Sequence, residues 1–191
     1  MNSFTVLPDS YKRIMRINLL GDEKAFKEIR DLSVILHIVM LIPGFFITPL
    51  KMPTWQTFFK IIITLAGIFI YTCLHEAVHG IFMKIFGGKK VVYGFKMGCA
   101  YAGSDDFFKK RPYMVIALAP VVIWGIVLLF LTVKLGEDWF WVVYFIQVVN
   151  VAGAAGDFYV FYKLIPIPSD ALVTDSGTDI KVYSAKLFQV S

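Results

Sequence analysis

Hydrophobic positions in this chain gather into four long runs that polar stretches separate. The runs are Leu32–Leu50, Phe58–Phe86, Pro112–Val133 and Trp139–Tyr162. A helix needs about 20 residues to cross the apolar part of a bilayer, and each run has about that length or more. The pattern therefore predicts four membrane-spanning helices, with Pro43 and Pro120 expected to kink the first and the third.

The stretches outside these runs divide the chain into three parts. Residues 1–31 are expected to form a cytosolic or interfacial segment, residues 32–165 a membrane-embedded core, and residues 166–191 a cytosolic tail. Tyr11–Leu20 mixes basic and apolar side chains. This mixture favours an amphipathic helix, which could lie on anionic lipid or pack on the bundle.

The loop between the second and third runs has a different period. Large and small side chains alternate over Val91–Tyr101, which predicts a strand or hairpin. Such an element could cap the helices as a small sheet, or its edge could pair with an extended peptide. The predicted fold is an all-α integral membrane protein of about four transmembrane helices with a small cytosolic β-hairpin.

Composition supports this class. Of the 191 residues, 58% are hydrophobic and 17% are charged, whereas soluble domains have roughly 45–50% and 25%. These fractions exclude a disordered chain and argue against an ordinary soluble enzyme. The two cysteines form no CxxC pair, so a thiolate zinc knuckle is excluded.

Basic residues are distributed asymmetrically between the two predicted sides of the membrane. Six Lys and Arg lie before residue 32, seven from Lys84 to Arg111, and three after the fourth run. Only Lys51, Lys60 and Lys134 fall on the other side. The positive-inside rule therefore predicts a multi-pass protein of the cell membrane with both termini in the cytosol. The net charge of +5 is explained by this asymmetry and by contact with membrane lipid, and we expect no nucleic-acid partner.

The second run contains the clearest chemical signal, an H-E-x-x-H motif formed by His75, Glu76 and His79. Positions four apart lie on one face of a helix, so two imidazoles there can bind one Zn²⁺ ion. Zinc lowers the pKa of a bound water toward about 7, and Glu76 is placed to act as the general base. Ionisable residues inside a membrane span are costly and mark functional sites. The alternative is a buried polar cluster bonded to other helices.

A catalytic zinc site needs a third protein ligand, and the spans offer Asp157 and His37. Asp157 is favoured because it and His75 each lie 17 or 18 residues from the outer start of their runs, hence at a similar depth near the cytosolic leaflet. The alternative for Asp157 is an ion pair with Lys163 or Lys84. His37 lies at a similar depth. It could be a metal ligand, a group that supports a ligand, or a hydrogen-bond partner of a neighbouring helix.

Asn150 lies seven residues before Asp157 and therefore on the same helix face. It could hydrogen-bond a substrate carbonyl, a ligand or a neighbouring backbone group. Gly153 and Gly156 lie between them, and small residues let helices approach closely in lipid.

These motifs together resemble a known family, the small bacterial membrane proteins grouped as putative zincin peptidases. The resemblance covers about residues 30–185 and rests on four stretches: residues 75–80, Ala117–Pro120, Asn150–Asp157 and Asp175–Gly177. It implies a zinc-dependent peptidase.

The order of the motifs is also similar to the core of site-2 proteases, which cut substrates within or near the membrane. That similarity implies zinc ligands at His75, His79 and Asp157, a base at Glu76, and zinc toward the cytosol. One difference concerns the last motif. In site-2 proteases the Asp precedes a Gly, whereas here Gly156 precedes Asp157.

The sequence therefore predicts a membrane-embedded zinc metallopeptidase that hydrolyses a membrane-associated or extended peptide. Two other functions fit the same residues. A membrane protein could bind zinc for structure or sensing without hydrolysis, or a small transporter could use the His, Glu and Asp side chains as relay groups. The transporter is less favoured because the sequence shows no inverted repeat.

Overall fold

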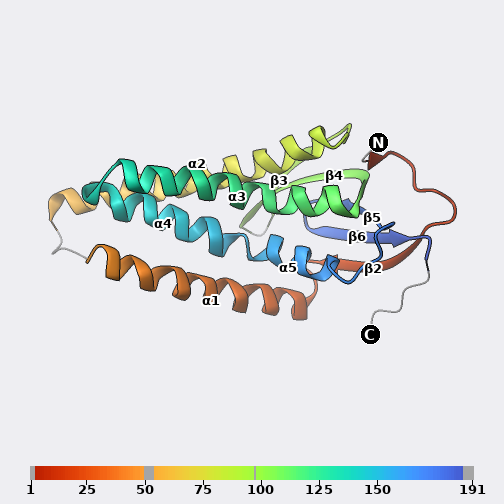
Figure 1. Ribbon diagram of the computed structural model, residues 1–191, viewed down its shortest axis with the longest axis horizontal. Coiled ribbons are helices and arrows are strands. Elements are labelled where there is room, and N and C mark those ends of the chain that lie inside the picture. Colours follow the sequence, from red (N-terminus) through yellow and green to blue (C-terminus); the bar gives the residue numbers. More distant parts are fainter. Residues whose placement is uncertain (1–2, 50–53, 97, 187–191) are drawn as a thin grey trace.

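The computed structural model describes residues 3–49, 54–96 and 98–186 and comprises a helical bundle with a β-sheet at one end (Figure 1). The helices are α1 (Glu23–Ile47), α2 (Trp55–Ile85), α3 (Lys110–Lys134), α4 (Glu137–Gly153) and α5 (Ala155–Leu164). The strands are β1 (Ser3–Phe4), β2 (Lys12–Asn18), β3 (Val92–Lys96), β4 (Cys99–Lys109), β5 (Leu172–Asp175) and β6 (Asp179–Ser184). Leu50, the predicted end of the first run, and Met97, within the predicted hairpin, lie outside the described residues.

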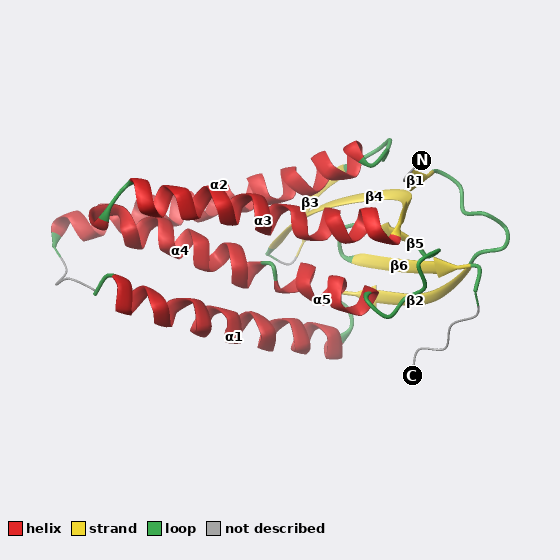
Figure 2. Cartoon of the chain, viewed as in Figure 1, coloured by secondary structure: helices red, strands yellow, loops and turns green. Residues whose placement is uncertain are grey.

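The four predicted apolar helices are confirmed. Within the described residues, four segments are long and apolar enough to cross a membrane: α1, α2, α3, and α4 taken together with α5. α1 begins at Glu23, nine residues before the apolar run, because Asp22 caps it by accepting the backbone N–H groups of Lys24 and Ala25. The N-terminal ends of α1 and α3 and the C-terminal ends of α2 and α5 lie at the sheet end of the bundle (Figure 2).

The sheet corrects the all-α assignment. Six strands pair antiparallel in the order β1-β4-β5-β6-β2, and β3 also pairs with β4 (Figure 2). The predicted hairpin is present as β3 and the first half of β4. The second half of β4 recruits strands from both ends of the chain, so the sheet is larger than a small hairpin.

The predicted amphipathic helix over Tyr11–Leu20 is wrong, because these residues form β2. Six of its seven residues pair with β6, from Lys12↔Ser184 to Asn18↔Asp179, with an irregularity between Arg13 and Met15. The basic side chains that indicated a lipid-facing helix remain exposed, and Ile17 is buried. A partner strand some 160 residues away supplies hydrogen bonds that local propensity does not reveal.

The predicted tail likewise contributes structure rather than only polar chain. β5 and β6 are almost fully buried at Val173, Ile180 and Val182, which pack in one core with Phe108 of β4 and Leu164 of α5. This core joins the sheet to the adjacent ends of α2, α3 and α5.

Candidate metal centre

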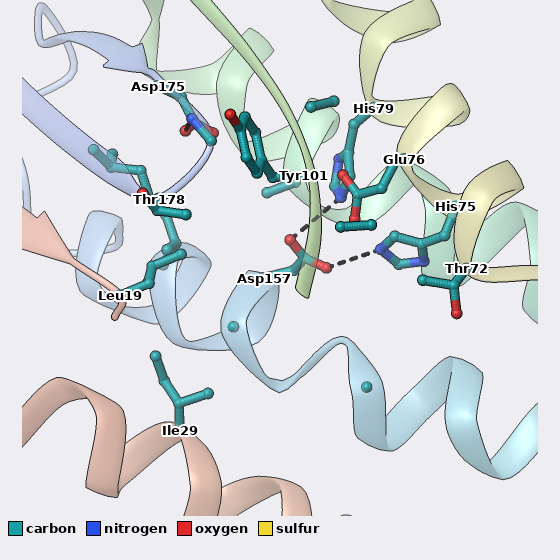
Figure 3. A pocket seen from close by; sticks show the side chains of 18 of the residues that line it. Leu19, Ile29, Thr72, His75, Glu76, His79, Tyr101, Asp157, Asp175 and Thr178 are labelled. Atoms are coloured by element: carbon teal, nitrogen blue, oxygen red, sulfur yellow. Dashed lines mark hydrogen bonds and ion pairs between the residues drawn. The ribbon is translucent and has the colours of Figure 1, made fainter. Parts of the chain in front are cut away.

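His75, Glu76 and His79 lie in the last third of α2, where the helix approaches the sheet (Figure 3). The helical spacing of four places both imidazoles on one face, with ring centroids 4.9 Å apart. Both histidines are buried, whereas Cys73 is exposed. The motif face of α2 therefore points into the protein.

Asp157 reaches this face because the last span is broken at Ala154. α4 ends at Gly153 and α5 starts at Ala155, in a stretch where glycine at 153 and 156 weakens helix continuity by roughly 1 kcal/mol per residue. Asp157 consequently lies in the first turn of α5, where the helix dipole favours a carboxylate. The structure brings Asp157 next to His75, whereas their equal depth in a bilayer stays a prediction.

The three side chains converge on a small volume. Asp157 Oδ2 lies 3.2 Å from His75 Nε2, and Asp157 Oδ1 lies 3.4 Å from His79 Nε2. Candidate ligand atoms from the three residues all lie within 4.8 Å of one another. Ligands of tetrahedral zinc at 2.0–2.1 Å are about 3.4 Å apart, so the donor set and spacing fit zinc.

Neither basic side chain that could have paired with Asp157 does so. Lys163 Nζ lies 3.6 Å from Glu28 Oε2, and this pair joins α5 to α1. Lys84 lies in the last turn of α2, beyond the metal-facing positions. Within the described residues, the ion-pair contacts of Asp157 are those with the two histidines.

Glu76 lines the same cavity, next to the His–His–Asp group (Figure 3). The backbone N–H of Ala102 in β4 is directed toward its carboxylate. The strand therefore lies alongside Glu76.

The second ring nitrogen of each histidine also has a partner. His79 Nδ1 lies 2.9 Å from the carbonyl oxygen of Ile116 in α3. His75 Nδ1 lies 2.8 Å from the Tyr71 hydroxyl, which donates to Asn150 Oδ1 at 2.9 Å. Because that hydroxyl has one proton, His75 donates its Nδ1–H to the Tyr71 oxygen. Both Nε2 atoms are thus left to face Asp157.

Asn150 supports this arrangement from a fully buried position in α4. Its Nδ2 donates to the carbonyl of Val121 at 3.1 Å, which fixes the orientation of the amide. The structure thus places Asn150 against Tyr71 and a neighbouring backbone group. It lies outside the residues that line the cavity.

His37 is not brought to the site. Its Nδ1 lies 2.8 Å from the carbonyl of Ser33, one turn earlier in α1. Ser33 in turn donates to the carbonyl of Ala152 at 2.8 Å. His37 is therefore bonded within α1, and it does not line the cavity.

A cavity of about 370 Å³ opens beside the three candidate ligands. Apolar side chains from the N-terminal part of the chain, including Leu19, Phe26 and Ile29, form one wall, and the start of β4 forms another. No Lys or Arg is among its described lining residues. Small-residue and aromatic positions of β4, such as Ala100 and Tyr101, lie beside the metal centre (Figure 3).

Asp175 is a further acidic residue of the cavity wall. Its carboxylate accepts the Tyr113 hydroxyl at 2.6 Å and the Gly177 N–H at 2.8 Å. Burial raises the pKa of Asp175, and these two hydrogen bonds offset part of that rise. The Asp175 side chain therefore connects the turn between β5 and β6 to α3 through these two hydrogen bonds.

A family profile described as "Putative zincin peptidase" matches residues 68–172, more than half of the chain. The chain belongs to this family. The matched stretch of the zincin peptidase profile contains all of α2 from its middle onward and continues to the first residue of β5. It therefore includes the candidate ligands and Glu76, whereas β1, β2 and β6 lie outside it.

A curated relative of this chain comes from Pyrococcus woesei, where it is described as an uncharacterized 24.7 kDa protein in the gap 5′ region. The two are 32% identical over 113 residues, which cover 56% of this chain and 49% of the relative. The chain therefore spans about half the length of this relative. No solved structure matches the chain at a significant level.

Sequence reasoning missed two groups that contact His75 and His79. Tyr71 precedes His75 by four residues, so helical spacing alone places it one turn away on the same face. The sign of the Ile116 carbonyl in the sequence is indirect. Pro120, four residues later, has no N–H to bond it. Neither group belongs to the pattern of His, Glu and Asp residues that marks the site in the sequence.

Proposed function

We propose that the protein is a membrane-embedded zinc metallopeptidase that hydrolyses peptide bonds in or near the bilayer. The observation that carries the proposal is the convergence of His75, His79 and Asp157, with Glu76 beside them. Membership of the zincin peptidase family supports the same reaction class. Two imidazoles, one carboxylate and an adjacent glutamate are the donor set and base of a hydrolytic zinc site.

The three ligands would hold Zn²⁺ with one position open toward the cavity. The bound ion would supply Lewis acidity, polarising the substrate carbonyl and making the attacking water more acidic. Glu76 accepts a proton from that water as the new C–O bond forms at the carbonyl carbon. It then delivers the proton to the amide nitrogen as the C–N bond breaks, so the reaction adds one water across the peptide bond.

Substrate would bind as an extended segment along β4. The N–H of Ala102 is directed toward Glu76, and polar backbone groups two residues apart point to the same side of a strand, so those of Ala100 face the same way. β5 pairs with β4 only from Ser104 onward. Because the Ala102 N–H is already directed to Glu76, the edge groups left for a peptide next to the metal centre are those of Ala100 and the carbonyl of Ala102. An extended peptide also exposes the carbonyl that a helix would shield.

The position of the site supports a substrate at the membrane surface. The candidate ligands lie at the sheet end of the helices, where the predicted topology places the cytosol. Exposed apolar residues cover the outer faces of α1 and α2. We propose a site-2-protease-like activity on membrane-associated peptides that reach the site in extended form.

The test compares purified wild-type protein with variants in detergent and in lipid nanodiscs. Metal analysis is expected to give one zinc per wild-type chain, and none in Asp157→Ala. Glu76→Gln should retain zinc and lose about 10²–10⁴-fold in cleavage of labelled casein and of a reconstituted single-span peptide. His37→Ala is the matched control for loss of a histidine outside the site and should retain zinc.

Three other outcomes would each contradict a different part of this proposal. Unchanged cleavage in Glu76→Gln would remove the glutamate from the mechanism. Zinc without any cleavage by the wild type would favour a structural or sensing role. Full zinc occupancy in Asp157→Ala would assign the third ligand to another residue.

A further inference from the structure

The carbonyl of Ile116 lacks its normal partner within α3. In an α-helix each carbonyl accepts the N–H of the residue four positions later. For Ile116 that residue is Pro120, which lies inside α3 and has no N–H. The proline ring also crowds the carbonyl four residues earlier and turns it away from the helix axis. Ile116 and Pro120 are both buried, so water cannot satisfy this carbonyl.

His79 supplies the missing donor. Its Nδ1 lies 2.9 Å from the Ile116 carbonyl oxygen, and the imidazole is buried too. A carbonyl is an acceptor only, so His79 must carry its proton on Nδ1. The lone pair then lies on Nε2, the atom 3.4 Å from Asp157 Oδ1. The bond to α3 therefore selects both the tautomer and the ring orientation that a metal site requires.

We propose that Pro120 is a positioning residue of the metal centre. Pro120 has no backbone N–H, so the Ile116 carbonyl accepts its hydrogen bond from His79 instead. This bond directs His79 Nε2 toward the metal. Pro120 touches neither metal nor substrate in this role and acts through a backbone carbonyl on another helix. The inference rests on the proposed zinc site and adds a residue that determines how tightly that site binds zinc.

Pro120→Ala tests the proposal, since alanine restores an N–H that competes for the Ile116 carbonyl. Partners that orient a ligating histidine typically contribute 10–100-fold to metal affinity. Zinc affinity, measured by competition with a chelator in detergent, should fall by that amount. Pro43→Ala is the matched control, because Pro43 also lies inside a helix, α1, away from the cavity-lining residues. It should bind zinc as the wild type does.

Two further measurements separate positioning from a general effect on folding. Circular dichroism and gel filtration should give equal helix content and size for both proline variants. The ¹⁵N spectrum of labelled histidine in the zinc-free protein should show the Nδ1–H form of His79 in the wild type and in Pro43→Ala. In Pro120→Ala it should show a mixture of tautomers, which a purely structural proline would not produce.

A second variant keeps Pro120 and weakens the acceptor instead. Replacing Ala117 by lactic acid converts the Ile116 carbonyl into an ester carbonyl, a poorer acceptor. Zinc affinity should fall in this variant as well. Wild-type zinc affinity in folded Pro120→Ala and in the ester variant would overturn the role of Pro120 and leave the peptidase proposal intact. Failure of the wild type itself to bind zinc would overturn both.

Discussion

At the scale of single residues, the site is determined by hydrogen bonds to the far side of each imidazole. His75 donates toward the Tyr71 oxygen, and His79 donates to the Ile116 carbonyl. These partners come from three different helices when Asn150 is included. The ligand residues were predictable, since His, Asp and Glu have few structural reasons to lie inside an apolar span. Their partners were not, because tyrosine, asparagine and a backbone carbonyl are common in any helix contact.

Tyr71→Phe should weaken zinc binding without removing a ligand. Loss of the hydroxyl leaves both His75 Nδ1–H and Asn150 Oδ1 without the partner seen here, in a buried setting where such losses are costly. We expect zinc affinity to fall about 10–100-fold in chelator competition. Tyr144→Phe is the control, since its hydroxyl donates to the carbonyl of Met40 at the contact between α1 and α4. Equal affinity in the two variants would contradict a role for Tyr71 in orienting His75.

At the scale of elements, glycines decide how closely the sheet approaches the helices and its own turns. A Cβ at Gly80 of α2 would lie within 2.6 Å of the ring of Tyr93 in β3. A Cβ at Gly103 of β4 would lie 2.6 Å from the backbone of Gly177. The glycine after the second histidine therefore admits the hairpin, and Gly103 admits the turn between β5 and β6. Both contacts bring strands to the cavity.

Gly177→Ala should disturb the sheet more than an ordinary glycine replacement. Gly177 has φ +94°, and a Cβ there would overlap the ring of Tyr101, which lines the cavity. Gly136 has φ +70° with no atom within 4 Å of a Cβ, so Gly136→Ala carries only the backbone strain of about 1–3 kcal/mol. The thermal unfolding midpoint should fall further in Gly177→Ala, with reduced peptide cleavage. Equal shifts in both variants would show that Tyr101 tolerates displacement.

The helices could be predicted from sequence and most of the sheet could not, for one physical reason. A membrane helix satisfies its backbone hydrogen bonds locally, so a long apolar run is sufficient evidence for it. β2 and β6 satisfy theirs with each other across most of the chain length. β2 is also basic and only seven residues long, and its alternation is interrupted near Met15. The β3–β4 hairpin was predictable because its partners are adjacent in sequence.

At the scale of the whole molecule, charge asymmetry predicts how the bundle lies in the membrane. The helices alternate in direction, so the N-terminal segment, the β3–β4 loop and the C-terminal strands lie at one end (Figure 1). Sixteen of the nineteen Lys and Arg side chains belong to these segments and the helix ends next to them, residues 1–31, 84–111 and 163–191. That end should face the cytosol, because basic loops are retained there.

Labelling of single cysteines tests this orientation, in a chain whose native Cys73 and Cys99 are replaced by serine. Val6→Cys and Leu135→Cys place exposed thiols at opposite ends of the molecule. A membrane-impermeant maleimide added to intact cells should label Leu135→Cys and leave Val6→Cys unlabelled until the cells are lysed. The opposite pattern would place the candidate metal centre near the outer surface.

The order of the strands has a consequence for biosynthesis. Both β4 and β2 pair with strands encoded in the last twenty residues that the structure describes, and Thr178 and Ile180 from this region line the cavity. A nascent chain that has reached the end of α5 already contains His75, His79 and Asp157 but neither β5 nor β6. The cavity wall is therefore completed only after β5 and β6 have left the ribosome, so a product terminated before residue 172 has the helices and the candidate ligands without an assembled cleft.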